Sequence, residues 1–319
     1  MVSIVRYHPD QKHLWDSFVE SAANATFLHR RDYMEYHKHR FVDHSILVMD
    51  RNKLVAILPC NESDQYLYSH GGLTYGGLLT QPGIKTTTII DLFTELQLYC
   101  RDNEIQGIYY KPVPGIFQRH RTESDLYAVY QSGGQLVGRD ICTAIQLNSY
   151  QIPSKKLSGA RKARAAGIEV VKSEDFSAFF DIVNEGLQSK YGVTATHTAE
   201  EMQYLYTLFP RHIQLITAVS GTKIYGGLLL YAAGQTLHAQ YIAVTQEGKK
   251  VRCLDLLIQY ITSTAGSFDW FSFGISSEHK GEYTNASLLS SKEEFFTSPL
   301  CFDYYFIPAS PEIKIGVRV

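Results

Sequence analysis

The feature that most constrains the fold is an alternating strand that runs through a short basic turn into an amphipathic helix, between Thr236 and Ile261. One buried face of the helix is indicated by apolar residues at the i, i+3, i+4, i+7 spacing, namely Leu254, Leu257, Ile258 and Ile261. We expect the helix to begin at about Arg252.

Unpaired backbone N–H groups at a helix start attract anions. Beside this start lie one glycine and three cations, Gly248, Lys249, Lys250 and Arg252. Together they predict a site for the diphosphate of a nucleotide-like carrier, and hence group transfer from that carrier. The alternative is an ordinary strand-to-helix connection with solvated lysines.

Length and charge bound the class of protein. At 319 residues the chain is longer than one core usually holds, so two domains of about 150 residues each are expected. Hydrophobic residues make up 45% and charged residues 19%, as in a folded globular protein. The net charge of −2 argues against a broad nucleic-acid surface, although a local basic patch remains compatible with it.

The five cysteines are single, unpaired in spacing and odd in number, which argues against a disulfide framework or a zinc site. The first residues carry charge and histidine where a signal peptide has an apolar core, and no apolar run has the length of a membrane span. We therefore expect a cytoplasmic protein without a bound metal.

Periodicity predicts an α/β protein in which one plan occurs twice. Helices are expected over 11–22, from Arg30 and over 86–99. A hairpin over 45–59 and a strand over 107–111 are followed, in the second half, by a hairpin over 213–231 and a strand over 270–273. A polar stretch ending in Pro153 suggests a boundary, giving domains 1–148 and 149–319.

Acyl transfer to an amine needs a proton acceptor and a proton donor. His238 and Gln240 alternate with Tyr241 along the predicted strand, so the first two share one face and Tyr241 lies on the other. His238 is a candidate base and Tyr241 a candidate proton donor; the alternative is that both are packed in the core.

Two further segments contain candidate substrate contacts. SHGGLTYGGLL (69–79) has two glycine pairs, which allow close approach of a ligand, and His70 and Tyr75 would then contact an acceptor; the alternative is a turn and a bulged strand. Glu278 follows a predicted strand and is the best candidate carboxylate, or else a solvated loop residue.

Cations provide the remaining candidates. Lys292 follows Asn285, a reasonable helix N-cap, and either contacts a substrate or forms surface ion pairs. Arg161 and Arg164 lie in the densest basic run, on one face if the run is helical. This run would suit a sugar nucleotide, a lipid-linked pyrophosphate or the acceptor arm of a tRNA, but such runs are commonly solvated faces.

Five blocks of the sequence resemble the FemAB-like branch of the GNAT (N-acetyltransferase) superfamily, particularly its polysaccharide-biosynthesis-associated acetyltransferases. They are FLHRRDYMEYHKHRF (27–41), SHGGLTYGGLL (69–79), HTAEEMQYLYTLFP (197–210), HAQYIAVTQEGKKVRCLDLL (238–257) and FGISSEHKGEYTNASLLSSKEEF (273–295). The resemblance implies two GNAT-like domains in tandem, each a mixed central sheet flanked by helices, and transfer of an acyl or aminoacyl group to an amine.

The resemblance also implies where a donor would lie. It would rest along the strand at Gln240, Ile242 and Val244, with its diphosphate at 247–252, and Lys292 would contact a phosphate or a carbonyl. The usual superfamily turn, Q/R-x-x-G-x-G/A, has a second glycine position, whereas this chain has Gly248 alone.

Our leading hypothesis is a bacterial acyltransferase that moves an acetyl or related group from acyl-CoA to an amine of a cell-envelope polysaccharide or sugar-nucleotide precursor, which could be lipid-linked. One alternative uses aminoacyl-tRNA, as in peptidoglycan branching. Another is a non-catalytic sugar-nucleotide-binding module of the same fold. The sequence leaves the oligomeric state open.

Overall fold

The structure, a computed structural model, describes residues 2–310 and divides into two compact units. Of the described chain, unit 1 comprises 2–140, 277–283 and 301–310, and unit 2 comprises 141–276 and 284–300. The chain first leaves unit 1 within strand β9 (Gln135–Gln146), returns to it briefly at 277–283, and re-enters it for the last time within strand β17 (Ser298–Pro308). This division differs from the predicted domains 1–148 and 149–319. The first boundary between the units falls inside β9, at 140/141, and not in the polar stretch that ends in Pro153.

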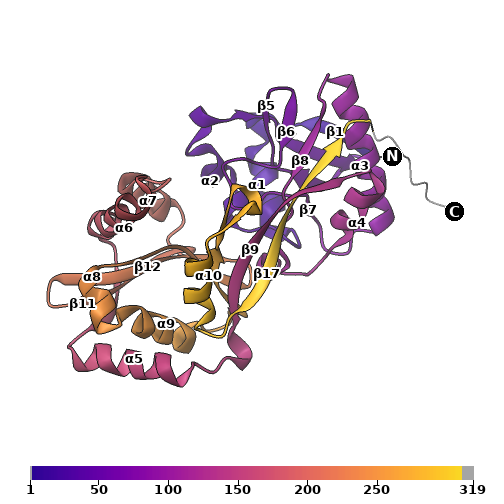
Figure 1. Ribbon diagram of the computed structural model, residues 1–319. Coiled ribbons are helices and arrows are strands. Elements are labelled where there is room, and N and C mark those ends of the chain that lie inside the picture. The colour runs from indigo at the N-terminus through magenta and orange to yellow at the C-terminus, as the bar shows by residue number, and fades with distance from the viewer. Residues whose placement is uncertain (1, 311–319) are drawn as a thin grey trace. The chain divides into compact units, whose positions relative to one another are not determined.

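Unit 1 combines strands in two sheets with helices packed on them (Figure 1). One sheet has the order β1 (Val2–Arg6), β3 (Ile46–Asp50), β4 (Lys53–Leu58), β7 (Leu79–Thr80). The other strands of this unit have the order β9, β17, β8 (Gly107–Tyr110), β6 (Tyr66–Tyr68), β5 (Asn61–Ser63), β2 (Val42–Asp43). Its helices are α1 (Lys12–Ser21), α2 (Arg31–Glu35), α3 (Thr86–Asp102) and α4 (Ser124–Gln131).

Unit 2 is a twisted sheet between two helical layers. Its strands have the order β10 (Glu169–Ser173), β11 (Ile213–Ser220), β12 (Lys223–Ala233), β13 (Thr236–Val244), β14 (Trp270–Ile275), β9. Its helices are α5 (Ser154–Ala165), α6 (Phe176–Tyr191), α7 (Ala199–Leu208), α8 (Gln246–Val251), α9 (Cys253–Thr264) and α10 (Ala286–Glu293). In Figure 1, α6 and α7 lie on one face of the sheet and α5 and α9 on the other.

The core of unit 2 explains this layering. Leu257, Ile258 and Ile261 of α9 are buried in one cluster with Ile216 and Leu228 of the sheet. Because helices cover both faces, β12 can be a nearly continuous apolar run instead of an alternating one. Full burial of each such side chain stabilises the fold by about 1.5–3 kcal/mol relative to exposure.

The predicted elements are largely confirmed. The hairpins, the helix over 86–99 and the strands over 107–111 and 270–273 correspond to β3–β4, β11–β12, α3, β8 and β14. The helix predicted from Arg30 is shorter than expected, since α2 ends at Glu35 and the 3-10 turn Lys38–Arg40 follows. Both units also contain one parallel strand pair, β6–β8 and β13–β14, which supports the repeated plan.

Residues 277–284 form a small separate feature, in which β15 (Ser277–Glu278) pairs with β16 (Tyr283–Thr284). Within residues 2–310, no helix combines the length and the apolar character needed to span a bilayer. The same part of the chain contains no group of three or more His, Cys, Asp or Glu side chains placed to hold a metal ion.

Candidate functional site

Strands β13 and β14 of unit 2 separate after a short parallel pairing. Their registered pairs run only from Thr236–Trp270 to His238–Ser272. Beyond these pairs β13 continues along β12 to Val244, and β14 reaches Ile275 opposite β9. Backbone groups that face such a gap lack a ladder partner and are available to an extended ligand or a carbonyl group. We call this gap the strand opening.

A β-bulge shapes the β13 side of the strand opening. The register with β12 pairs Leu229 with Tyr241 and Leu230 with Ala239, so Gln240 is the extra residue. Bulges re-aim side chains, and the strict alternation predicted for His238, Gln240 and Tyr241 is therefore wrong. Ala239, Ile242 and Val244 all pack with the α9 core cluster. Without the bulge, Ala239 would lie on the opposite face of the strand from Ile242 and Val244.

The bulged Gln240 has an unsatisfied side chain. Its Oε1 is buried and has no hydrogen-bond partner among residues 2–310. Leaving a buried polar group unpaired costs about 1–3 kcal/mol. A ligand that donates a hydrogen bond here would remove that cost.

Tyr241 packs toward α6 and the segment before α7. Its ring contacts Phe180 with a centroid separation of 5.2 Å, and its hydroxyl lies 2.8 Å from Nδ1 of His197. The backbone N–H of His197 donates to the same hydroxyl at 3.3 Å, and burial raises the pKa of Tyr241. The hydroxyl proton is thus held by a local network. Sequence reasoning missed His197, although it begins one of the blocks that resemble the FemAB-like branch.

His238 is buried at the point where the strands separate. Its Nδ1 lies 3.1 Å from Oγ of Ser272, which also accepts from the N–H of Gly274 at 3.2 Å. Burial, with a smaller effect of Lys292, lowers the pKa of His238 to about 4. The ring is therefore neutral at pH 7 and a weak proton acceptor, so this environment favours a positioning role over the predicted role of base.

Lys292 reaches the end of β14 from α10, which Asn285 caps as predicted. Its Nζ donates to the carbonyl oxygens of Gly274 at 3.1 Å and Ile275 at 2.7 Å. Gly274 has φ +75°, a conformation that glycine adopts without strain. Burial lowers the pKa of Lys292 to about 8, so this amine can exchange a proton near neutral pH.

The predicted anion-binding turn has a different structure. A helix, α8, already begins at Gln246, and Arg252 in a left-handed conformation (φ 65°) separates it from α9. The N–H of Gly248 donates to Oγ1 of Thr245 at 3.0 Å, and a Cβ at Gly248 would lie 2.0 Å from the Tyr225 carbonyl oxygen. Gly248 therefore serves close packing of α8 on β12, and its amide is not free for a ligand.

Several charged side chains around α8 already form ion pairs within the chain. Glu247 in its first turn forms an ion pair with Lys223. Arg252 donates to Asp255 through Nε at 2.7 Å and Nη2 at 2.6 Å, and buried Lys156 lies 3.7 Å from Asp255. Lys249 and Lys250 are exposed, and the charge of Lys250 contributes to lowering the pKa of Glu247, after the larger effect of Lys223.

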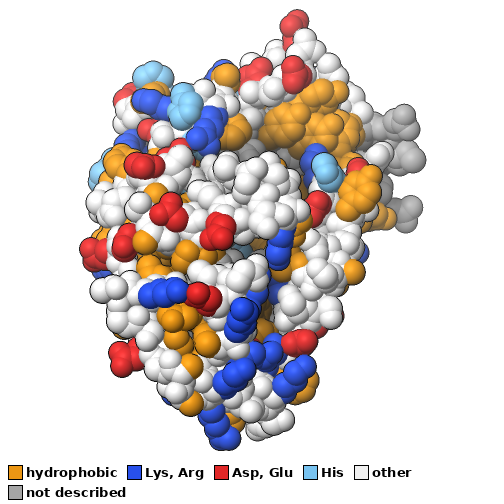
Figure 2. Space-filling model, turned by 60° about the vertical axis from the view of Figure 1, so that its left-hand side comes forward, with side chains coloured by type: hydrophobic (Ala, Val, Ile, Leu, Met, Phe, Trp, Pro, Cys, Tyr) orange, Lys and Arg blue, Asp and Glu red, His pale blue; other side chains and the backbone are white. Residues whose placement is uncertain are grey.

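The basic run lies on α5, where Arg161 and Arg164 are exposed. Blue side chains gather at the lower end of Figure 2, at the height of α5 and α8 in Figure 1. Arg164 lines a cavity of about 400 Å³ together with Gly167, Leu256 and Tyr260.

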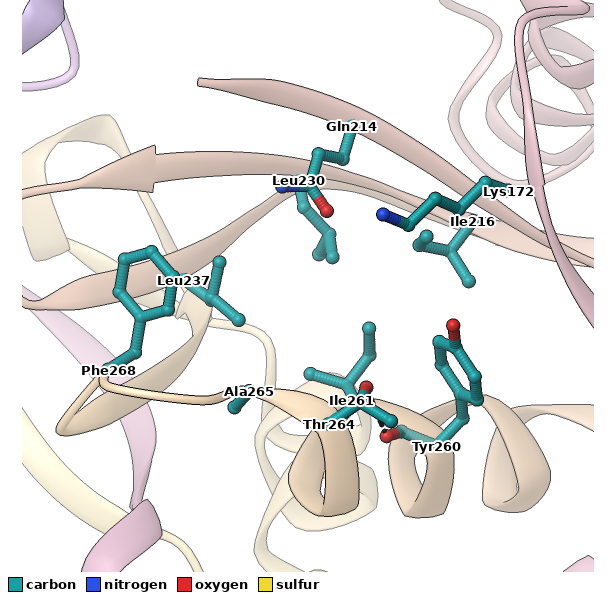
Figure 3. Close-up of a pocket in the computed structure, with 10 residues that line it drawn as sticks. All are labelled: Lys172, Gln214, Ile216, Leu230, Leu237, Tyr260, Ile261, Thr264, Ala265 and Phe268. Atoms are coloured by element: carbon teal, nitrogen blue, oxygen red, sulfur yellow. Dashed lines mark hydrogen bonds between the residues drawn. The ribbon is translucent and has the colours of Figure 1, made fainter. Parts of the chain in front are cut away.

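A neighbouring cavity of about 230 Å³ lies between α9 and the sheet (Figure 3). Apolar side chains, among them Leu230, Leu237 and Ile261, form its interior, with Lys172 at one side. None of the predicted site residues lines this cavity, and Leu237 lies at the start of β13, away from the bulge at Gln240.

Three predicted site residues belong to unit 1. His70 lines a cavity of about 280 Å³, and burial lowers its pKa to about 3. Tyr75 is buried in the core, where its hydroxyl donates to Oγ1 of Thr26 at 3.3 Å, so it does not line that cavity. Glu278 is exposed in β15.

Solved structures resemble this chain over nearly its whole length. FemX aligns with a TM-score of 0.68 and 12% identity over 95% of this chain and 97% of its own. The C-terminal domain of a putative lysylphosphatidylglycerol synthetase from Agrobacterium fabrum aligns with a TM-score of 0.58 and 9% identity, over 93% and 91%. A tandem GNAT protein from the clavulanic acid biosynthesis pathway aligns with a TM-score of 0.52 and 12% identity, over 98% and 100%.

The chain has a FemX-like tandem GNAT fold. The predicted fold class is thereby confirmed. No protein-family model matches the sequence, and a search of curated proteins gives no significant match. At these identities the structural likeness establishes the GNAT fold and leaves the substrates to be argued from the site.

Proposed function

We propose that unit 2 transfers an acyl group from an activated carrier to an amino group, with the reacting carbonyl bound in the strand opening. The observation that carries this proposal is the separation of β13 and β14 beside the unpaired oxygen of Gln240 and the ammonium group of Lys292. The tandem GNAT fold supports a transferase of this class.

The chemistry needs a neutral amine, a polarised carbonyl and a proton for the leaving group. The amine nitrogen attacks the carbonyl carbon, and N–H groups that face the strand opening would stabilise the developing oxyanion. As the intermediate collapses, the carbon–sulfur or carbon–oxygen bond to the carrier breaks and the leaving atom takes a proton. The amine nitrogen loses one proton to solvent, so the transfer is balanced without a covalent enzyme intermediate.

We assign the leaving-group proton to Lys292. It is protonated below pH about 8 and lies at the end of β14. Its lowered pKa makes proton donation easier than from an exposed lysine. We assign positioning roles on β13 to two residues. His238 is hydrogen-bonded to Ser272, and Tyr241 is hydrogen-bonded to His197. The role of Glu278 as a carboxylate that accepts this amine proton through water stays a prediction.

Acyl-CoA is the first candidate donor, with its acyl chain along Gln240, Ile242 and Val244 and its diphosphate beside Lys249 and Lys250. The proposed acceptor is the amine of a bacterial cell-envelope polysaccharide or sugar-nucleotide precursor, met in the cytoplasm. Arg161 and Arg164, exposed on α5, are proposed as contacts for anionic groups of the substrates.

A second candidate donor is an aminoacyl ester such as aminoacyl-tRNA. The arrangement of α8 favours it over acyl-CoA, because the Gly248 amide is capped, Glu247 adds a carboxylate to the first turn and Arg252 is bound by Asp255. Fewer backbone amides and cationic side chains at α8 are then left to bind a diphosphate. The name of the lysylphosphatidylglycerol synthetase similarly points to aminoacyl transfer in that protein.

The donor is tested by offering the purified chain acetyl-CoA and, separately, charged tRNA, with a panel of amino sugars and amine-bearing envelope precursors. Mass spectrometry then detects N-acylated or N-aminoacylated products. We expect product from one donor and not from the other. Donor binding without product from either would overturn the transferase assignment in favour of a binding module.

The diphosphate position is tested by the double variant Lys249→Glu, Lys250→Glu. Calorimetry with acetyl-CoA should show affinity at least tenfold weaker, a loss of about 1.4 kcal/mol, with little change in melting temperature. Lys190→Glu, an exposed lysine at the end of α6, is the matched control and should bind normally. Unchanged affinity in the double variant would remove α8 from the donor site.

A further inference from the structure

Unit 1 contains its own cavity beyond the ends of a parallel strand pair. The pairing of β6 with β8 ends at Tyr68 and Tyr109, and the cavity of about 280 Å³ lies directly beyond these residues. All its lining residues belong to unit 1, including Lys280 and residues 304–305 of β17. The carboxyl ends of parallel strands are a common place for ligands.

Tyrosine rings form flat walls in this cavity. Tyr68 and Tyr109 stack with ring centroids 5.0 Å apart and an interplanar angle of 12°. Tyr304 is fixed by its hydroxyl, which donates to Oδ2 of Asp140 at 2.5 Å. Stacked and hydrogen-bonded rings present rigid surfaces against which another flat ring can lie at little cost in conformational entropy.

Two lysines supply positive charge to the same cavity. The ammonium group of Lys111 lies 4.8 Å from the Tyr304 ring centroid, and that of Lys280 lies 5.2 Å from the Tyr109 ring centroid. Neither ammonium group forms an ion pair with a carboxylate within residues 2–310, since the nearby Asp140 accepts from Tyr304 and from Ser277 instead.

Lys111 is the less solvated of the two. Its pKa is lowered to about 8, mainly by enclosure; Asp140 opposes this shift and the charge of Lys280 adds to it. Its ammonium group has no hydrogen-bond acceptor among the described residues. An enclosed cation without an anion is unfavourable, and a bound anion would relieve both the desolvation and the repulsion between the lysines.

We propose that this cavity binds a phosphate monoester carried on a single flat ring, with Lys111 and Lys280 holding the phosphate and the tyrosine walls holding the ring. A dianion matches two cations better than a monocarboxylate does. The volume suits one ring with its phosphate, since pockets for larger ligands usually exceed about 300 Å³. This site is independent of the transfer reaction proposed for unit 2.

Phenyl phosphate is a suitable probe, and the test uses the full chain. Trace labelling with acetic anhydride at several pH values, read by peptide mass spectrometry, reports the reactivity of each lysine. We expect phenyl phosphate to raise the pKa of Lys111, because an anion favours its charged form, and so to slow its labelling at least fivefold at pH 8. Lys53, exposed at the start of β4, should be unaffected. Unprotected Lys111 would overturn the proposal.

Calorimetry with four probes separates the contributions of ring and phosphate. Phenyl phosphate should bind at least tenfold tighter than inorganic phosphate, glucose 1-phosphate or phenol. Lys111→Met and Lys280→Met should each weaken it at least tenfold, while Lys53→Met should not. Equal binding of glucose 1-phosphate would overturn the flat-ring assignment, and unchanged binding by Lys111→Met would overturn the phosphate assignment. Lys292→Met should leave phenyl phosphate binding intact, which keeps this test apart from that of the transferase.

Discussion

Two enclosed lysines stand out at the residue scale because neither has a carboxylate partner. Lys292 donates to two backbone carbonyls in unit 2, and Lys111 lies against a tyrosine ring in unit 1. In both, burial lowers the pKa to about 8. Lys156 is as buried as Lys292 but forms ion pairs with Asp255 and Glu294, as a structural lysine does. Burial of a lysine without a counter-charge is characteristic of a site that binds an anion or transfers a proton.

The titration of Lys292 gives a pH prediction. Its ordinary pKa of 10.5 is lowered to about 8 in the folded chain, so the ammonium form needed for proton donation is lost as the pH rises through about 8. Acyl transfer should rise with pH as the acceptor amine loses its proton, then fall above pH about 8. Lys292→Arg should keep its charge and lose the fall, and Lys292→Met should lower kcat by roughly 10²–10⁴.

Initial rates between about pH 6 and 10 measure both effects, with Lys190→Met as the control for loss of an exposed lysine. An unchanged pH profile in Lys292→Arg would assign the alkaline limb to another group. Full activity in Lys292→Met would exclude Lys292 from proton transfer.

At the element scale, the sequence predicts elements whose pattern is local and misses features set by neighbours. The apolar stripe of α9 and the β3–β4 hairpin are visible as periodicity, and the structure contains both. The bulge at Gln240 depends on which residues of β12 lie opposite, and the break at Arg252 depends on how α8 packs on that strand. Local pattern is therefore enough to propose a site on β13, whereas the directions of its side chains and the state of the Gly248 amide depend on neighbouring strands and could not be predicted.

The packing of α8 gives a stability prediction. At Gly248 a Cβ would meet the backbone oxygen of Tyr225 at 2.0 Å, a contact that no side-chain rotation relieves. Gly248→Ala should therefore lower the free energy of unfolding by about 1–3 kcal/mol. Gly186, inside α6 with open space around it, is the matched glycine, and Gly186→Ala should raise that free energy by about 0.4–1 kcal/mol.

Urea unfolding followed by circular dichroism provides the two midpoints. If Gly248→Ala were as stable as the parent chain, α8 would not be packed against β12 as described.

At the scale of the whole molecule, the repeated plan was visible in the sequence but the path of the chain was not. Pattern alone placed a boundary at 148/149, where a polar stretch ends in Pro153. In the structure β17 returns to unit 1 and pairs with β8, from Tyr305 opposite Tyr110 to Pro308 opposite Gly107. A pairing between strands so far apart in the sequence leaves no local pattern, because either strand would look the same with another partner.

This path predicts that the predicted domain 1–148 does not fold alone. Fragment 1–148 lacks β17, so the edge of β8 is unpaired and the place of buried Ile307 in the core of unit 1 is empty. Exposed strand edges promote aggregation, and loss of a buried isoleucine side chain costs about 2–5 kcal/mol. We expect fragment 1–148 to be insoluble or to unfold without a cooperative transition, and co-expression with 149–319 to restore a soluble complex. In the full chain, Ile307→Ala should speed hydrogen exchange in β8 and α3 more than in α9, whereas Ile307→Val should change it little. A stable, cooperatively folded 1–148 fragment would contradict the assignment of β17 to unit 1.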